Sequence, residues 1–315
     1  MADIPGIEQP LLQSLPQLQS RMTFLYLERC LLKRADGAIE VWTQEGVTHL
    51  PAACICALLL GPGTNITHQA VELIAEAGVT LIWTGEAGVR YYASGRPMTR
   101  SSAMLIRQAT MVSNTRMHLA VAKMMYQMRF PDEDVSSLTM QQLRGREGSR
   151  IRQVYRNCSK QWKVEWDGRE YDKNDFAAGN DVNKALSAGH ACLYGLAHAI
   201  IAALGCSPGL GFVHVGHENS FVYDIADLYK AEVTIPAAFE MAASQPKDIG
   251  GETRRKVRDM LVEKHIAERM VKDIHTLFSC VLSEELPLDE VQLWNGTSDL
   301  VKNGYNFAPL EEDKL

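Results

Sequence analysis

Short apolar stretches separated by turn residues dominate the first 95 residues, and this pattern is typical of β-strands. One stretch differs, because its apolar residues recur with helical spacing over 67–77 and a glycine, Gly78, follows. The predicted strands cover residues 23–33, 38–43, 47–50, 55–60, 79–83 and 89–93. Residues 1–95 are therefore predicted to form a β-rich, sandwich-like domain with one helix.

Helical periodicity replaces this pattern after residues 94–100, which read SGRPMTR and are the best candidate for a linker. The predicted helices cover residues 103–112, 116–129, 138–162, 181–204, 236–243 and 254–282, the second of them rich in methionines suited to core packing. Residues 96–283 are thus predicted to form a larger all-α domain, which makes the chain an α+β protein. From residue 284 onward eight acidic residues outnumber two basic ones, so 284–315 is predicted to be a mobile acidic tail.

The composition limits which binding partners and which cellular compartment are expected for this chain. A formal net charge of -6 excludes a general attraction to nucleic acid, so any DNA binding must come from a local basic patch. The seven cysteines form no C-x-x-C pair and lie mostly among apolar residues, which favours reduced thiols in the cytoplasm. No stretch approaches the roughly 20 apolar residues of a membrane span, so no membrane partner is expected.

Residues 210–230 combine apolar positions with side chains that bind metal ions. A strand-like apolar run ends at His214, and a predicted helix, with Ser220 as its N-cap, carries Asp224 and Asp227 on one face. Carboxylate oxygens and imidazole are ligands for Mg²⁺ or Mn²⁺, and carboxylates on an apolar helix are costly unless a cation or hydrogen-bond donors satisfy them. The alternatives are a hydrogen-bonded core histidine and a solvated helix face.

A second informative stretch, residues 143–163, is strongly basic and contains one acid, Glu147. Arginine forks suit phosphate oxygens, so this helix is a candidate DNA-binding surface. Its basic residues are Arg144, Arg146, Arg150, Arg152, Arg156, Lys160 and Lys163. Gly145 and Gly148 flank the acid, and each costs a helix about 1 kcal/mol, which favours close approach of another backbone or a ligand. The alternative is an exposed helix face with surface ion pairs.

The two stretches together predict one chemistry if they meet in space. Glu147, His214 and Asp227 would then surround a single divalent cation, with arginines beside it to hold a phosphodiester backbone. Such a layout serves metal-dependent phosphoryl transfer on nucleic acid.

The chain contains the motifs QLRGREGSRIR at 142–152, CLYG at 192–195, GFVHVG at 211–216 and SFVYDIADLYK at 220–230. Together they resemble the spacer-acquisition integrase and endonuclease that is the first of the numbered CRISPR-associated proteins, in its subtype I-E form. GPGTNITHQAV at 61–71 and GEAGVRYYASG at 85–95 resemble the same family, and the likeness runs from about residue 22 to about residue 282. The resemblance implies a β domain followed by an α-helical catalytic domain.

The resemblance also implies roles for single residues. It makes Glu147, His214 and Asp227 the ligands of Mg²⁺ or Mn²⁺, with Asp224 as a supporting residue and Tyr194 close to the site. Two further matches are Lys230, which follows the two acids, and Arg90 in the β domain, both expected near DNA.

The implied activity is the joining of a prespacer to a CRISPR array. The 3′-OH ends of the double-stranded prespacer attack phosphodiesters of the array by transesterification. The implied partners are a second copy of the chain, forming a homodimer, and the small second CRISPR-associated adaptation protein. Two alternatives remain open: a structure-specific metal nuclease that hydrolyses branched DNA, and a DNA scaffold without enzymatic activity.

Overall fold

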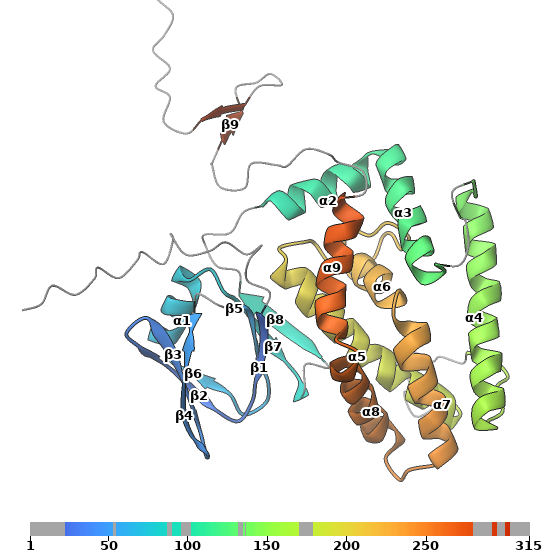
Figure 1. The fold of residues 1–315 in the computed structure, drawn as a ribbon, viewed down its shortest axis with the longest axis horizontal. Helices are drawn as coiled ribbons and strands as arrows, with labels where there is room; N and C mark the ends of the chain where they lie inside the picture. The colour runs from blue at the N-terminus through green and yellow to red at the C-terminus, as the bar shows by residue number, and fades with distance from the viewer. Residues whose placement is uncertain are drawn as a thin grey trace, which may run out of the picture.

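A β-rich unit precedes a larger helical unit, as Figure 1 shows for the computed structural model of the chain. The structure describes residues 23–52, 55–86, 90–95, 102–131, 135, 137–169, 179–279, 292–294 and 300–302. The predicted fold class, an N-terminal β domain and a larger all-α part, is confirmed.

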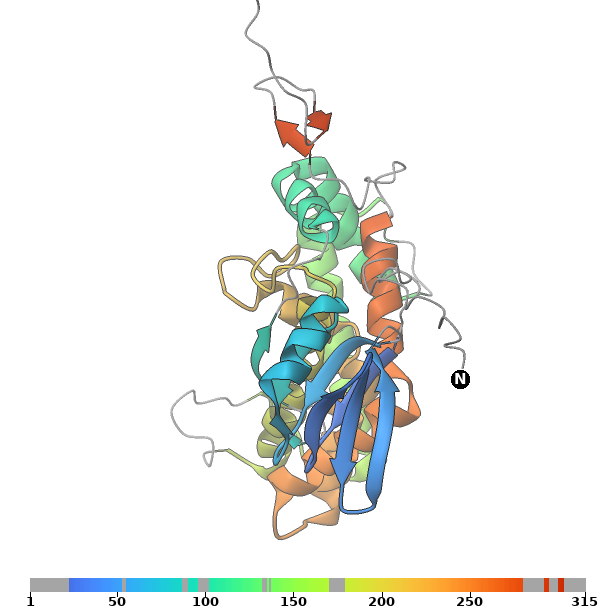
Figure 2. The same cartoon turned by 90° about the vertical axis from the view of Figure 1, so that its left-hand side faces the viewer.

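The β-rich unit contains two four-stranded sheets and one helix. The first sheet has the order β1-β5-β7-β8, with only the last pair antiparallel, and the second has the order β4-β3-β2-β6. The bounds are β1 Thr23–Leu27, β2 Leu31–Ala35, β3 Ala38–Thr43, β4 Gly46–Pro51, β5 Ile55–Leu60, β6 Asn65–Ile66, α1 His68–Glu76, β7 Thr80–Thr84 and β8 Tyr91–Gly95. Apolar side chains of both sheets and α1 share one core, and Figure 2 shows the three together in front of the helices.

The predicted strand over 23–33 is wrong, because the chain breaks at 28–30 into β1 and β2, which belong to different sheets. Arg29 has a φ of 50°, in the left-handed region, and its N–H donates to Pro62 O at 3.0 Å. The apolar pattern continues across this bend and therefore conceals it.

The helical unit is built around α5, which contacts α6, α7, α8 and α9. The bounds are α2 Ala103–Ser113, α3 Thr115–Arg129, α4 Met140–Trp162, α5 Asp181–Ala203, α6 Ser220–Asp227, η5 Lys230–Thr234, α7 Ile235–Ser244, α8 Ile249–Glu263 and α9 Ile266–Ser279. Helix α5 is long and apolar enough to cross a membrane by length and composition, but most of it is buried among these neighbours. It is the core helix of this unit.

The same helix joins the two units. Ala199 and Ala203 of α5 pack on Ala57, Leu59 and Ile82 of the first sheet, and all five are buried. Alternate residues of β5 face opposite sides, so β5 serves this interface and the core of its own unit. This two-sided burial explains why 55–60 is apolar throughout.

The C-terminal helices differ in two ways from those that the apolar periodicity predicts. The predicted helix over 254–282 is wrong: α8 begins earlier, at Ile249, and the chain breaks before α9 at His265, whose φ is 50°. Between α6 and α7 the backbone forms a π-helix, η5, whose first residue is Lys230. Such wide turns accommodate an extra residue and are frequent at functional sites.

The predicted linker and tail stay predictions. Strand β8 extends to Gly95 and α2 begins at Ala103, while most of the residues between lie outside the described part of the chain. The predicted tail also lies outside it, apart from the short antiparallel strands β9 (Gln292–Trp294) and β10 (Leu300–Lys302).

Candidate active site

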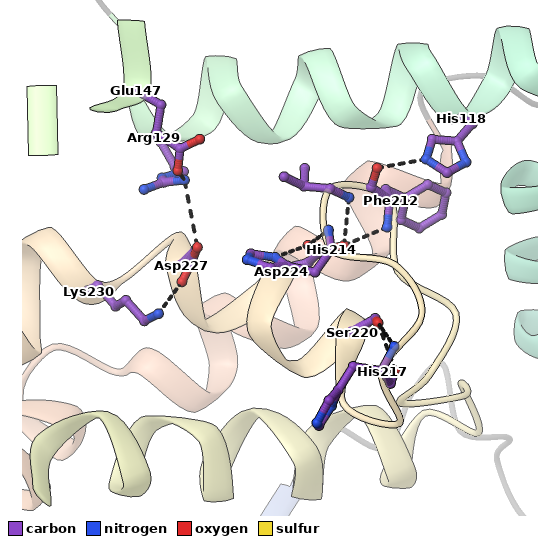
Figure 3. Close-up of polar contacts among 11 residues, drawn as sticks. His118, Arg129, Glu147, Phe212, His214, His217, Ser220, Asp224, Asp227 and Lys230 are labelled. Carbon is purple, nitrogen blue, oxygen red and sulfur yellow. Dashed lines mark hydrogen bonds and ion pairs between the residues drawn. The ribbon is translucent and has the colours of Figure 1, made fainter. Parts of the chain in front are cut away.

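The segment that carries His214 is held by a carboxylate. Predicted to be strand-like, it has no regular secondary structure, because Asp224 of α6 replaces a neighbouring strand as its hydrogen-bond partner. Asp224 Oδ2 accepts from the N–H groups of Phe212 (2.5 Å) and Val213 (3.1 Å), and Oδ1 accepts from His214 N (2.9 Å). His214 Nδ1 lies 2.8 Å from the same Oδ1 (Figure 3), which leaves Nε2 as the ring nitrogen available to a ligand.

The other side of this segment is fixed from α2 and α3. His118 Nε2 lies 2.7 Å from Phe212 O, and His118 Nδ1 lies 3.0 Å from Val112 O. The side-chain amide of Gln108 donates to the carbonyls of Ser207 and Leu210, both at 2.9 Å. The approach to His214 is therefore anchored at several points.

Close packing requires a glycine at the start of the segment. A Cβ on Gly211 would collide with His214 O and with Ser220, because the loop folds back onto the beginning of α6. Ser220 was predicted to be the N-cap of this helix, but it is the first residue of α6. Asn219 occupies the N-cap position and makes no capping hydrogen bond. The Ser220 hydroxyl instead closes the loop by accepting from His217 N at 3.0 Å.

Asp227 and Asp224 lie on the same helix but have different partners. Asp227 Oδ1 is buried and lies 2.5 Å from Lys230 Nζ, a contact that lacks the geometry of a hydrogen bond. Lys230 Nζ also lies 4.9 Å from the ring centroid of Tyr194, so the structure places all three predicted residues together. Asp224 therefore holds the loop that carries His214, whereas Asp227 contacts cations.

Glu147 reaches the same place from α4. Arg129, the last residue of α3, donates from Nη1 to Glu147 Oε1 and lies 4.0 Å from Asp227 Oδ2 with the same nitrogen. Figure 3 shows Glu147 and Asp227 on opposite sides of this guanidinium. Acids from α4 and α6, which are far apart in the sequence, therefore meet at one cation.

A small pocket adjoins this meeting point. It is lined by Met125, Tyr126, Arg129, Val213, His214, Asp224 and Asp227. Burial, and then Glu147, raise the pKa of the Tyr126 phenol. Residues from α3, α4, α6 and the 211–216 loop thus contribute to one site.

The chemistry of this site fits a divalent cation. Two carboxylates and an imidazole are oxygen and nitrogen donors of the kind that Mn²⁺ and Mg²⁺ bind, and Asp227 Oδ1 is a buried oxygen without a hydrogen-bond partner in the described residues. Within the described part of the chain, however, no three acidic, histidine or cysteine side chains are already gathered as a ligand set. Arg129 lies between the two acids instead.

The charges of the site follow from these contacts. The hydrogen bond to Asp224 raises the pKa of His214 above its ordinary value, although burial acts in the opposite direction. Burial alone would lower the pKa of Lys230, but Asp227 and Tyr194 outweigh it, so the net shift is upward and the side chain is a cation.

The arginines of α4 lie outside the pocket on an exposed face. Arg144, Arg146, Arg152 and Arg156 are exposed, whereas Arg150 is half-buried with its guanidinium 4.8 Å from the ring centroid of Phe130. In Figure 1, α4 forms the edge of the molecule opposite the β unit. Helix α4 therefore carries several exposed arginines in addition to Glu147.

The two glycines of α4 are not explained by packing within the chain. A Cβ on Gly145 would meet nothing within 4 Å, and one on Gly148 would meet only the guanidinium of Arg152, at 3.5 Å. The predicted close approach of another backbone is therefore absent among the described residues, and approach of a ligand stays a prediction.

Two other predicted positions lie at the border of the site. Arg90 is exposed and directly precedes β8, a strand that contacts α5. His217, in the loop that follows His214, is exposed, and its Nδ1 accepts from the N–H of Asn219 at 3.1 Å.

Two residues of this site, Tyr126 and Arg129, were missed by the sequence reading. Both lie in 116–129, whose methionines indicated core packing, and Met125 is indeed 2% exposed. The available signal was the spacing of Tyr126 and Arg129, three residues apart at the end of an apolar helix, where they share one face.

Comparison with known proteins identifies close relatives. The family model for "CRISPR associated protein Cas1" matches residues 24–132 and 128–272. The chain is 48% identical over 301 residues to the CRISPR-associated endonuclease Cas1 of Clostridium sp. (strain SY8519), covering 95% of this chain and 100% of that protein. It is 44% identical over 281 residues to the CRISPR-associated endonuclease Cas1 2 of Thermus thermophilus, covering 89% of this chain and 86% of that protein. A crystal structure of a TtCas1–DNA complex superposes with a TM-score of 0.79 at 46% identity, covering 84% of this chain and 99% of that one.

Proposed function

The chain belongs to the Cas1 family of CRISPR-associated proteins, and on this basis we propose that it is a divalent-metal-dependent DNA endonuclease and integrase of CRISPR adaptation. The observation that carries the proposal is the meeting of Glu147 and Asp227 at one guanidinium beside the pocket that His214 lines. The proposal extends to the subtype I-E form, on the motifs that resemble it.

The proposed reaction joins a prespacer 3′ end to the CRISPR array. The 3′-oxygen attacks a phosphorus of the array, a new P–O bond forms, and the bond to the leaving 3′-oxygen breaks. The proton of the attacking hydroxyl passes through solvent to the leaving oxygen, and the number of phosphodiester bonds is unchanged. Bound Mg²⁺ or Mn²⁺ would neutralise charge on the phosphorus oxygens.

In this step the protein would hold the cation and align the reacting DNA ends. Glu147, Asp227 and Nε2 of His214 would hold the cation, while Asp224 fixes the Nδ1 side of the ring and the backbone that leads to it. Lys230 is a cation at the edge of this group, where a DNA phosphate would approach. Alignment of attacking and leaving groups is the main requirement of phosphoryl transfer.

The basic face of α4 is the proposed contact with double-stranded DNA. Its exposed arginines are suited to phosphate oxygens and supply affinity without reading bases. Arg90 would offer a separate phosphate contact on the β unit. The solved DNA complex of TtCas1 supports a DNA-binding role for the same fold.

The proposed partners follow the family likeness. A second copy of the chain would form a homodimer, and the small second CRISPR-associated protein would join two such dimers on the DNA. The described cysteines Cys30, Cys158, Cys192 and Cys206 are buried free thiols, in line with action in the cytoplasm.

The decisive test is strand transfer by a His214→Ala variant, assayed with Mn²⁺ on a 3′-OH oligonucleotide duplex and a supercoiled plasmid. We expect the wild type to join the strands and the variant to lose joining at least a hundredfold, because one donor of the cation is gone. His217→Ala is the matched control, since it removes an exposed imidazole from the same loop.

The products separate the proposed function from its alternatives. Cut strands without joined ones in the wild-type reaction would make the protein a nuclease that uses water at the same ligands. Joining by His214→Ala at the wild-type rate would remove His214 from the site. Calorimetric titration showing no stoichiometric Mn²⁺ site would favour a DNA scaffold.

A further inference from the structure

Arg129 occupies an unusual position for a charged side chain. It ends α3, where the helix dipole favours a cation, and its side chain is only 9% exposed. Its guanidinium forms one wall of the pocket that His214 and Asp227 also line. A buried cation here must have a partner to offset the loss of hydration.

That partner is a pair of carboxylates. The same nitrogen, Nη1, donates to Glu147 Oε1 and lies 4.0 Å from Asp227 Oδ2. The two acids are 20% and 14% exposed at the side chain, so water screens their mutual repulsion only weakly. Arg129 therefore supplies the positive charge that offsets the repulsion between the two acids.

We propose that Arg129 is an internal counter-ion that holds Glu147 and Asp227 together and that a divalent cation must displace before it binds them. The inference rests on the proposed metal site and adds to it a competing residue of the chain itself. In this role Arg129 is a positioning residue, because it prepares the ligands.

Competition follows from the chemistry of the two cations. A guanidinium can only donate hydrogen bonds, so it binds the same carboxylate lone pairs that a metal ion needs. Both cations are also positive, so they repel each other at one set of oxygens. A metal ion that takes Glu147 Oε1 must therefore break the contact with Nη1.

The surroundings allow this exchange. Tyr126 lines the same pocket as Arg129, and its hydroxyl is buried without a hydrogen-bond partner in the described residues, so it can donate to a carboxylate that Arg129 releases. The Phe130 ring lies 5.5 Å from the Arg129 guanidinium and offers its face to the displaced cation. Lys230 contacts the other carboxylate oxygen of Asp227, Oδ1.

The test is calorimetric titration of Mn²⁺ into the full chain and into Arg129→Gln, without DNA. We expect Arg129→Gln to bind Mn²⁺ at least tenfold more tightly than the wild type. In chelator the variant should melt at a lower temperature than the wild type, because two buried acids repel, and Mn²⁺ should raise its melting temperature more. Lys256→Gln is the control, since it removes a half-buried ion pair with Glu240 on α7 and α8 and should leave Mn²⁺ affinity unchanged.

Arg129→Lys keeps the charge with a single ammonium and provides a second variant should Arg129→Gln fail to fold. We expect it to bind Mn²⁺ severalfold more tightly than the wild type, because one ammonium matches two carboxylates less well than a guanidinium. Equal or weaker Mn²⁺ binding by the variants, with a clear site in the wild type, overturns the role of Arg129 and leaves the proposed function standing. No Mn²⁺ site in any of these proteins overturns both.

Discussion

Asp224 and Asp227 show how two acids of one short motif acquire different tasks. Asp224 has a fully buried side chain that accepts from three backbone N–H groups and from His214, so its charge is used to fold the 211–216 loop. Asp227 faces Arg129 and Lys230 instead. Spacing places both on one helix, but only the packing around them decides which acid is structural.

Replacement of Asp224 by Asn should destabilise the protein by about 3 kcal/mol. Hydrogen bonds to a buried charged acceptor contribute roughly 1.5–3 kcal/mol each, and an amide nitrogen cannot accept. Urea unfolding at pH 7 measures the change. Asp227→Asn is the matched variant, for which we expect lost activity with a much smaller change in unfolding free energy. Equal losses of stability in the two variants would contradict this division of roles.

His190 of α5 should make the fold sensitive to acid. Burial, then Lys230 and Arg169, lower its pKa well below the ordinary 6.5, and its Nε2 is buried without a hydrogen-bond partner in the described residues. Below about pH 6.5 His190 is protonated in the unfolded chain but stays neutral in the folded protein. The free energy of unfolding therefore decreases as the pH falls below about 6.5.

A His190→Gln variant should lose less unfolding free energy than the wild type between pH 7 and pH 5. One proton corresponds to at most about 1.4 kcal/mol per pH unit, which urea unfolding at a series of pH values resolves. His217→Gln, which removes an exposed histidine, should follow the wild type. Parallel pH profiles of all three proteins would show that His190 does not titrate as argued.

At the scale of elements, local pattern predicts the helices well and their meeting points poorly. Helices α3, α4 and α5 begin and end within a few residues of their predictions, because apolar periodicity and caps such as Thr139 and Asn180 are local signals. The bends at Arg29 and His265 have left-handed backbone without a glycine, so no residue announces them. Arg129 could not be assigned to the site from sequence, because its two acids come from other helices.

Helix α4 should bind DNA through its exposed basic face. Arg152→Glu should weaken binding to duplex DNA at least tenfold and flatten its dependence on salt, because fewer counterions are released. Fluorescence anisotropy over a range of salt concentrations gives the slope. Arg258→Glu on α8 is the control, since it makes the same charge change elsewhere. An unchanged slope for Arg152→Glu would remove this stretch from the DNA interface.

At the scale of the whole molecule, the β unit rests on the helix that also forms the core of the helical unit. Small residues on α5 let the first sheet approach closely, and Tyr91 of β8 stacks on His198 with ring centroids 3.7 Å apart. Sequence predicted both units and the order in which they occur. It could not predict this interface, because an alanine on a long apolar helix gives no indication of whether it will contact a helix or a sheet.

Ala199→Leu should loosen the two units from each other. The added side chain overpacks a fully buried position and should cost about 1–3 kcal/mol, so we expect one calorimetric unfolding transition to split into two. Ala197→Leu overpacks the helical core on another face of α5 and should lower stability while keeping a single transition. A single, merely shifted transition for Ala199→Leu would show that the units do not unfold separately.

The wide turn of η5 limits which insertions and deletions this part of the chain tolerates. Removing one residue from 230–234 would leave a sequence able to continue as a regular α-helix, so the chain could still fold. Such a deletion would remove the wide turn and so move Asp227 relative to α7. Natural variation here should accordingly preserve length more strictly than side-chain identity, and single-codon deletions should abolish function where many substitutions do not.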